Sequence, residues 1–364
     1  MKKSNYSSIE SILNIAKRGG MFILVDDEKR ENEGDLIIST SDTNAKNINF
    51  MAKYGRGLIC LALDSLQAKR LNLTLMSPVN QSRNKTAFTV SIEAKKGITT
   101  GISAKDRAKT IKIASKKNVN KKDIVSPGHV FPIIAKDGGV LVRAGHTEAS
   151  VDISKLAKKN NSAVICEIMN EDGTMAKGQD LFNFAKKHNL KIGKIEDLIS
   201  YRLKKESLVF LKEKKIFNYN QTKYHLNIFS NKIDNLQHLA ISKGRISKNT
   251  IPKVRVISSN SIDVFLNKNT NLKIIKTLNY FHKSKNCILL IMRESALSDL
   301  PSTFSSKSII KKNSNENRLR YYGMGVQILK LLNVKKMILV SSSKKKLIAL
   351  DGFGIKIIKQ EIIK

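Results

Sequence analysis

Residues 21–39 read MFILVDDEKRENEGDLIIS, two apolar runs separated by a highly charged segment. The first run, residues 21–25, predicts a short strand, and residues 36–39 predict a second. The charged segment between them, residues 26–35, is expected to be a loop. The stretch therefore predicts a strand–loop–strand unit that carries a dense group of carboxylates between two apolar elements.

Helices and strands alternate around this unit. The Ser7-Ser-Ile-Glu10 pattern is a capping box and predicts a helix that stops at Gly19 and Gly20. Further helices are expected from Asp64, over residues 103–116 (capped by Ser103 or Thr100) and over residues 151–159, with strands over residues 57–63, 86–93 and 162–168. This half of the chain is therefore expected to be α+β, a mixed sheet with flanking helices.

The length of 364 residues predicts two domains, which we place at residues 1–205 and 206–364. A basic run at residues 202–206, followed by lysines at 212–215, is expected to be the linker. The second domain is expected to be of α/β type, with a helix over residues 325–332 and strands over residues 337–340 and 355–358.

Cellular location and redox state are constrained by simple patterns. The apolar runs are far shorter than the roughly 18 residues of a membrane span, and residues 1–10 lack the apolar stretch of a signal peptide. A cytoplasmic protein is expected. The three cysteines, Cys60, Cys166 and Cys287, are widely spaced and predict neither a disulfide framework nor a CxxC metal clip.

The net charge of +36 is the most extreme feature of the composition. Such a basic excess can indicate a nucleic-acid or membrane-surface partner. Lysine, however, far outnumbers arginine and is abundant along the whole chain, and no cluster of arginines with aromatic residues is present. We interpret the excess as compositional drift, which disfavours nucleic-acid binding.

The loop of residues 26–35 concentrates acidic side chains in this basic chain. Hard carboxylate oxygens that converge on one point suit Mg²⁺. Gly34 is expected to allow a tight turn that aims Glu31, Glu33 and Asp35 together, while Arg30 could bind a phosphate. A solvated hairpin loop is the alternative interpretation.

Two Gly-His pairs form a second group of candidate residues. His129 follows Gly128 and His146 follows Gly145, and both histidines are expected on loops where the main chain can approach a ligand. Arg143, Thr147 and the Gly145 amide could hold a phosphate or sugar hydroxyls. Glu167 ends an apolar strand, where it is either a buried acid or base or a solvent-facing residue.

Six segments together resemble the 3,4-dihydroxy-2-butanone 4-phosphate synthase family of riboflavin biosynthesis, over residues 8–200. The order and spacing of the segments match that family, and chance agreement of all six is improbable. The segments are DDEKRENEGD at 26–35, YGRGLIC at 54–60, TGISAKDR at 100–107, SPGHVFP at 126–132, RAGHTE at 143–148 and CEIM at 166–169.

The resemblance implies conversion of D-ribulose 5-phosphate to 3,4-dihydroxy-2-butanone 4-phosphate and formate by a homodimer. It implies that Glu31 and His146 ligate Mg²⁺ or Mn²⁺, and that His129 and Glu167 are needed for catalysis. Asp35 and Cys60 are further candidates near the reacting atoms. The residues implied to contact substrate are Arg30, Glu31, Asp35, Arg143, Ala144, Gly145, His146, Thr147 and Glu167.

The Thr99-Thr-Gly-Ile-Ser103 turn precedes a predicted helix and offers amide and hydroxyl donors. It could bind the substrate phosphate, with Arg107 as a helper. An ordinary helix cap is the equally simple interpretation.

The second half resembles GTP cyclohydrolase II only faintly, at residues 251–258, 320–334, 344–350 and 352–355. That enzyme family holds a catalytic zinc ion with three cysteines, but residues 258–272 contain no cysteine and Cys287 stands alone. Residues 292–300 also lack the glycines of the GTP-binding segment. We therefore expect no GTP cyclohydrolase activity, which disfavours a bifunctional enzyme, and expect a supporting remnant rather than a regulator or a basic binding surface.

Overall fold

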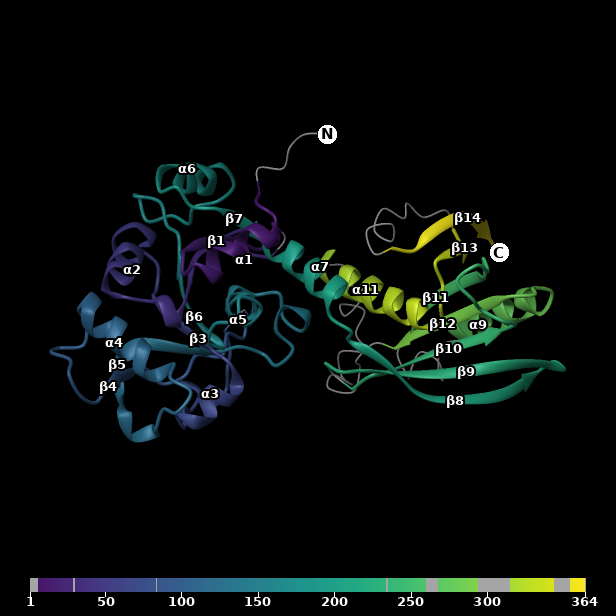
Figure 1. The fold of residues 1–364 in the computed structure, drawn as a ribbon, viewed down its shortest axis with the longest axis horizontal. Helices are drawn as coiled ribbons and strands as arrows, with labels where there is room; N and C mark the ends of the chain where they lie inside the picture. The colour runs from purple at the N-terminus through teal and green to yellow at the C-terminus, as the bar shows by residue number, and fades with distance from the viewer. Residues whose placement is uncertain are drawn as a thin grey trace. The chain divides into compact units, whose positions relative to one another are not determined.

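The computed structural model describes residues 6–28, 30–82, 84–233, 235–259, 268–293, 315–343 and 354–363. The chain divides into two compact units, Met1–Tyr201 and Arg202–Lys364 (Figure 1). Within the described ranges, none of the helices has both the length and the apolar character that a membrane span requires.

The first unit is built on a seven-stranded mixed sheet. The β3–β5 and β1–β7 pairs are parallel and the other pairs are antiparallel. This confirms the expected α+β class. In spatial order the strands are β4 (Ile92–Ala94), β5 (Ile124–Ile134), β3 (Cys60–Leu63), β6 (Ser162–Glu167), β2 (Gly34–Ser39), β1 (Phe22–Val25) and β7 (Ile192–Lys194).

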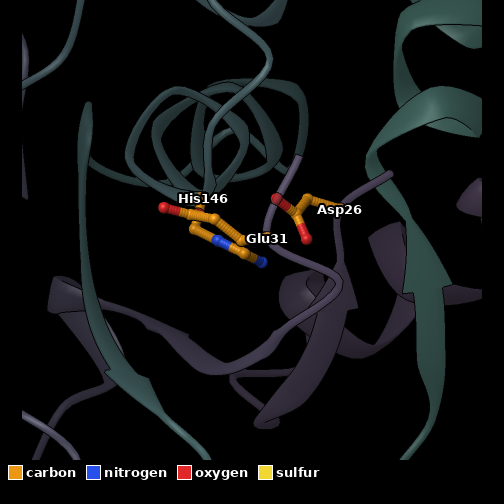
Figure 2. A group of neighbouring side chains, drawn as sticks. All are labelled: Asp26, Glu31 and His146. Atoms are coloured by element: carbon orange, nitrogen blue, oxygen red, sulfur yellow. The ribbon is translucent and has the colours of Figure 1, made fainter. Parts of the chain in front are cut away.

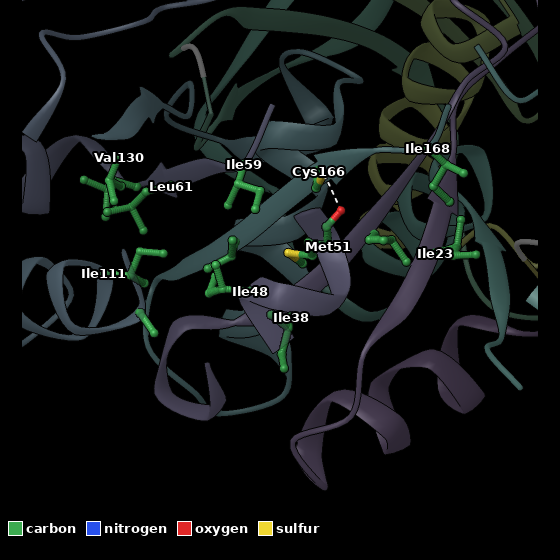
Figure 3. Close-up of a cluster of buried hydrophobic side chains, with 14 of the residues drawn as sticks. Ile23, Ile38, Ile48, Met51, Ile59, Leu61, Ile111, Val130, Cys166 and Ile168 are labelled. Carbon is green, nitrogen blue, oxygen red and sulfur yellow. Dashed lines mark hydrogen bonds between the residues drawn. The ribbon is translucent and has the colours of Figure 1, made fainter. Parts of the chain in front are cut away.

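Helices cover this sheet on both faces. Helix α5 (His146–Leu156) lies across β1, β2, β3 and β6, with α1 (Ile9–Lys17) beside it. The opposite face carries a hydrophobic core, to which α2 (Ala45–Phe50), α4 (Ala104–Ala114) and α6 (Gln179–Lys187) contribute (Figure 3). In that core the Cys166 thiol donates to the Met51 carbonyl at 3.7 Å.

The alternation of side chains along a strand decides which residues face α5. In β2, Leu36 and Ile38 enter the core cluster, so Asp35 points to the opposite face. The same parity places Glu167 of β6 and Cys60 of β3 on the α5 face, because Asp35 pairs with Glu167 and Cys60 pairs with Ile165. Both faces of the sheet are therefore buried and largely apolar, and the α5 face also presents a buried polar group.

Several predicted elements are confirmed, with shifted ends. Helix α1 ends before Gly19, whose φ is +77°, as predicted, but its cap is Ser8 rather than Ser7. Helix α4 is capped by Ser103. Helix α3 (Ser65–Arg70) follows Asp64, its cap. The predicted strand over residues 86–93 is largely wrong, because regular pairing begins only at β4 and the preceding residues form isolated bridges.

The division between the units falls at the start of the predicted linker, but these residues form regular secondary structure. Residues 202–205 belong to α7 (Ile195–Lys205), which continues across the division between the units, and residues 212–215 lie in β8 (Val209–Tyr219). Arg202 pairs with Glu206 at 2.6 Å within the supposed linker. The lysines of β8 are exposed at the edge of a sheet, where charged side chains disfavour unwanted pairing.

The second unit also contains a seven-stranded mixed sheet with helices on both faces, in agreement with the expected α/β type. Strands β12, β11, β13 and β14 run parallel, while β12, β10, β9 and β8 are antiparallel. The elements are β9 (Thr222–Asn231), β10 (Gln237–Lys243), β11 (Lys253–Ser259), α9 (Lys268–His282), β12 (Cys287–Arg293), α11 (Asn315–Leu331), β13 (Lys336–Ser341) and β14 (Lys356–Ile362).

Gln327 of α11 fixes the connection between α7 and β8. Its Nε2 donates to the carbonyls of Leu203 and Glu206, both at 2.8 Å, and its Oε1 accepts from the Leu208 amide at 2.8 Å. We expect Gln327→Ala to lower the free energy of unfolding by about 2–3 kcal/mol, because three main-chain groups lose their partner. Urea unfolding followed by circular dichroism measures this loss. The exposed Lys330→Ala on the same helix should change stability by less than about 0.5 kcal/mol, and equal midpoints for the two variants would refute the prediction.

Candidate active site

The acidic loop closes on itself through its first carboxylate. Buried Asp26 accepts from the Glu33 amide at 3.0 Å and from Arg30 Nη1 at 2.7 Å. The same Arg30 nitrogen also donates to the Glu31 carboxylate. Asn32, with φ of +55°, makes the turn. Arg30 is thus held between two carboxylates, and the loop has a defined conformation.

The expected role of Gly34 is wrong. Gly34 lies in β2 opposite Val25 rather than at a turn, and a Cβ atom there would approach Leu181 to 2.8 Å. The Glu33 carboxylate is 3.6 Å from Lys177 Nζ, and its charge also raises the pKa values of Asp35 and Glu167. The charges of Glu31 and Asp26 likewise raise the pKa of Asp35, so the loop adds Asp26 to the predicted group.

The structure brings Asp26, Glu31 and His146 together. One ligand atom from each lies within 4.8 Å of the others, and Figure 2 shows the three side chains gathered beside α5. His146 Nδ1 is 3.6 Å from Asp35 Oδ1, while its Nε2 is buried and has no hydrogen-bond partner within the described part of the chain. Two carboxylates beside an imidazole form a donor set that fits Mg²⁺ or Mn²⁺.

Sequence reasoning named Glu31 and His146 for this cluster but missed Asp26. The available signal was its position directly after the buried strand β1, where a side chain has a fixed direction. Burial lowers the pKa of the His146 imidazole, against the opposing effect of the Asp26 carboxylate. A neutral imidazole is the form that can bind a metal ion.

Asp35 and Glu167 form a cross-strand pair of carboxyl groups. They are direct partners in the β2–β6 ladder and share the α5 face, so their charges repel. Burial, followed by the charge of Glu167, holds the pKa of Asp35 well above its ordinary value. Burial also raises the pKa of Glu167, whose carboxylate accepts from the Leu58 amide at 2.9 Å. A Cβ atom at Gly57 would lie 2.5 Å from the Glu167 carbonyl oxygen, so glycine allows this approach.

Cys60 lies near this pair. Its thiol is buried, and burial, then the charges of Glu167 and Asp35, raise the pKa of Cys60 well above its usual value. The group is therefore a thiol rather than a thiolate at neutral pH.

The segment after residue 142 forms the start of helix α5 rather than a loop. Gly145 is the N-cap residue, and a Cβ atom there would lie 2.5 Å from Arg143 Nη1. Arg143 donates to Glu148 at 2.7 Å, and both Ala144 and Thr147 are buried. Within the described ranges no side chain caps the helix, so its first amide groups suit an anion, while the nearby guanidinium is already paired with Glu148.

His129 lies in another part of the sheet. It belongs to β5 rather than to a loop, its side chain is 44% exposed, and its Nδ1 is 2.7 Å from Glu93 Oε1. Strands β3 and β6 separate β5 from β2, which carries Asp35. Three strand spacings correspond to roughly 14 Å. The sheet therefore separates His129 from the cluster around His146 within one chain.

The donors of the turn at residues 99–103 are used within the chain. The Asp106 carboxylate accepts from the Thr99 hydroxyl at 2.7 Å and from the Thr99 and Gly101 amides at 3.2 Å. Ser103 accepts from the Asp106 amide at 3.1 Å. These bonds favour the ordinary cap over the phosphate site. Arg107 Nε is buried and has no hydrogen-bond partner within the described ranges.

Much of the sequence compared with GTP cyclohydrolase II lies outside the described residues: 260–267, 294–314 and 344–353. Cys287, at the start of β12, is fully buried. Burial raises the pKa of its thiol to about 11. Cys287 therefore has the environment of a core residue.

Known proteins match both units of the chain. The family model described as 3,4-dihydroxy-2-butanone 4-phosphate synthase matches residues 10–201, and that described as GTP cyclohydrolase II matches residues 212–362. A 3,4-dihydroxy-2-butanone 4-phosphate synthase of Photobacterium phosphoreum is 39% identical, covering 97% of this chain and 98% of the relative. A riboflavin biosynthesis protein RibBA of Aquifex aeolicus is 41% identical, covering 99% of this chain and 93% of the relative.

Solved structures agree with this match. RibBX of A. baumannii, a two-domain 3,4-dihydroxy-2-butanone 4-phosphate synthase, superimposes with a TM-score of 0.83 at 37% identity, covering 98% of this chain and all of that chain. A synthase in complex with two magnesium ions has a TM-score of 0.53 at 36% identity and covers 55% of this chain and 98% of that one. The chain therefore belongs to the 3,4-dihydroxy-2-butanone 4-phosphate synthase family, lyases of riboflavin biosynthesis.

Proposed function

We propose that the first unit converts D-ribulose 5-phosphate to 3,4-dihydroxy-2-butanone 4-phosphate and formate with Mg²⁺ or Mn²⁺. The observation that carries this proposal is the meeting of Asp26, Glu31 and His146, with a buried imidazole nitrogen that lacks a partner in the described structure. Glu31 and His146 would hold the ion, with Asp26 beside them. The solved relative with two magnesium ions supports the use of a divalent cation.

Asp35 and Glu167 are the residues that transfer protons in this proposal. A bound cation supplies Lewis acidity for the ketose oxygens. Enolisation then needs a base near C3, and loss of a hydroxyl needs an acid. Asp35 and Glu167 suit these two tasks, because burial raises the pKa of both carboxyl groups and the charge of Glu167 raises that of Asp35 further. Cys60 remains a thiol beside them.

The substrate is held at its charged end by residues 143–147. Arg143 and the first amides of α5 form an anion site at one side of the cluster, with Gly145 leaving room for the guanidinium. Arg30 lies at the other side, between Asp26 and Glu31. This arrangement would place the sugar oxygens over the cation cluster.

We propose a homodimer in which His129 serves the partner's site. Its exposure and its separation of roughly 14 Å from β2 support this placement. Mixing the inactive variants His129→Ala and Glu31→Gln should then restore part of the activity, because one of the two sites in a mixed dimer is intact. No recovery after the subunits have exchanged would exclude this arrangement.

The reaction is tested by incubating the full chain with ribulose 5-phosphate and Mg²⁺ while following formate. Formate release that EDTA stops, and that excess Mg²⁺ or Mn²⁺ restores, is the expected result. Formate release at the same rate in EDTA would remove the role of the cation, and no turnover with either ion would refute the proposed function.

The second unit is proposed to support the first without GTP chemistry of its own. Residues 258–272 have no cysteine to hold zinc, and Cys287 is buried. Purified protein with Zn²⁺ is expected to release no formate from GTP, and its release would refute this. We propose domains of residues 1–205 and 206–364, and truncation after Lys205 should lower the stability of the synthase. Undiminished stability and activity would argue against a supporting role.

A further inference from the structure

Asn84 connects the two ends of the candidate site. It lies between α3 and β4, and its side-chain Nδ2 donates to Glu31 Oε1. Its main-chain carbonyl accepts from Arg143 Nη2 at 3.3 Å, and the same nitrogen donates to the Thr86 hydroxyl at 3.2 Å. A single residue therefore contacts both the acid of the cation cluster and the arginine of the anion site.

The orientation of the Asn84 amide is settled by its partner. The opposite orientation would place the amide oxygen against a carboxylate oxygen, which repels it, so the NH₂ group must face Glu31. The other Glu31 oxygen accepts from Arg30, and the Glu31 main-chain oxygen accepts from Lys177 Nζ at 2.9 Å. Both carboxylate oxygens and the main-chain oxygen of Glu31 therefore accept a hydrogen bond, and the donor from Asn84 is a neutral group.

The segment that carries Asn84 is itself braced. Asn80 Nδ2 donates to the Thr86 carbonyl at 2.8 Å, and Asn80 Oδ1 accepts from the Ser82 amide at 3.0 Å. Lys85 adopts a φ of +48°, which reverses the chain after Asn84. These contacts fix the main chain from which the Asn84 side chain reaches the acidic loop.

We propose that Asn84 is a positioning residue that orients the Glu31 carboxylate for a divalent cation and ties that carboxylate to Arg143. The proposal rests on the proposed function of Glu31. A neutral donor fixes the direction of the carboxylate and leaves its negative charge available to the divalent cation. A positively charged side chain at the position of Asn84 would instead neutralise that charge. Removing such a partner of a metal ligand costs about 10- to 100-fold in affinity.

The test measures the binding of Mn²⁺ to the full chain, in the absence of substrate, by electron paramagnetic resonance. Asn84→Ala should raise the Kd for Mn²⁺ by about 10-fold or more. Asn84→Leu, which keeps the size of the side chain but has no donor, should do the same. In turnover, kcat should fall while KM for ribulose 5-phosphate stays within about twofold, because the main-chain bond to Arg143 remains.

Gln81→Ala is the matched control, since Gln81 is an exposed amide side chain of the same segment. It should leave the Kd for Mn²⁺ unchanged. The proposal is overturned if Asn84→Leu binds Mn²⁺ like the wild type, or if Gln81→Ala loses as much affinity as Asn84→Ala. Glu31→Gln separates the proposed function of Glu31 from the positioning role of Asn84. If Glu31→Gln binds Mn²⁺ normally, the proposed function fails. If Glu31→Gln binds weakly but both Asn84 variants bind normally, only the positioning role of Asn84 is refuted.

Discussion

Glu31→Gln is expected to weaken Mn²⁺ binding by at least about 100-fold and to slow formate release by about 10³-fold. The substitution keeps the size of the side chain but removes a charged oxygen from the cluster with Asp26 and His146. Loss of a direct ligand exceeds the 10- to 100-fold cost of losing a ligand's partner. A 10³-fold slower formate release corresponds to the loss of about 4 kcal/mol of transition-state stabilisation, which the bound cation would supply.

The matched control is Glu28→Gln, three residues before Glu31 in the same loop. The Glu28 side chain is exposed, so both the Kd for Mn²⁺ and kcat should stay within about threefold of the wild type. Isothermal titration with Mn²⁺ and a formate assay measure the two quantities. Equal losses in both variants would mean that the loop's total charge, rather than a site at Glu31, binds the ion.

Asp35→Asn is expected to make the cation-free protein more stable at pH 7 while abolishing most of its activity. The pKa of Asp35 is raised in the folded state by burial and by the charge of Glu167. A raised carboxyl pKa means that ionisation destabilises the folded state. This cost is absent below the ordinary pKa, grows as the pH rises through the ordinary value of 3.8, and is complete above the raised pKa. The neutral amide of Asn removes the cost.

Urea unfolding in EDTA measures this effect, because a bound cation would offset the carboxylate charge. The gain of Asp35→Asn should be near zero at pH 3.5 and reach on the order of 1–2 kcal/mol at pH 7. Asp42→Asn is the contrasting control, since Asp42 pairs with Lys159 at 3.1 Å and its loss should be neutral or destabilising. A less stable Asp35→Asn protein at pH 7 would show that the Asp35 carboxylate is compensated in the fold.

The sequence alone determined four strands of the first sheet and the principal candidate residues. Strands β1, β2, β3 and β6 were predictable, because each is a short apolar run bounded by polar residues, and burial of such runs dominates local preference. Glu31 and His146 were identified from the order of the motifs. These are properties of short segments, which can be recognised without knowing what packs against them.

The tertiary structure alone decided which residues meet. Register placed Asp35 opposite Glu167, and closure of the acidic loop placed Asp26 beside His146 while Glu33 turned to Lys177. The start of α5 at His146 was likewise decided by the packing of that helix on the sheet. The helical conformation of residues 202–205 depends in the same way on tertiary contacts, such as the bond from Gln327 of α11 to the Leu203 carbonyl. Contacts between segments far apart in the chain depend on how whole elements fit together, and no local pattern contains that information.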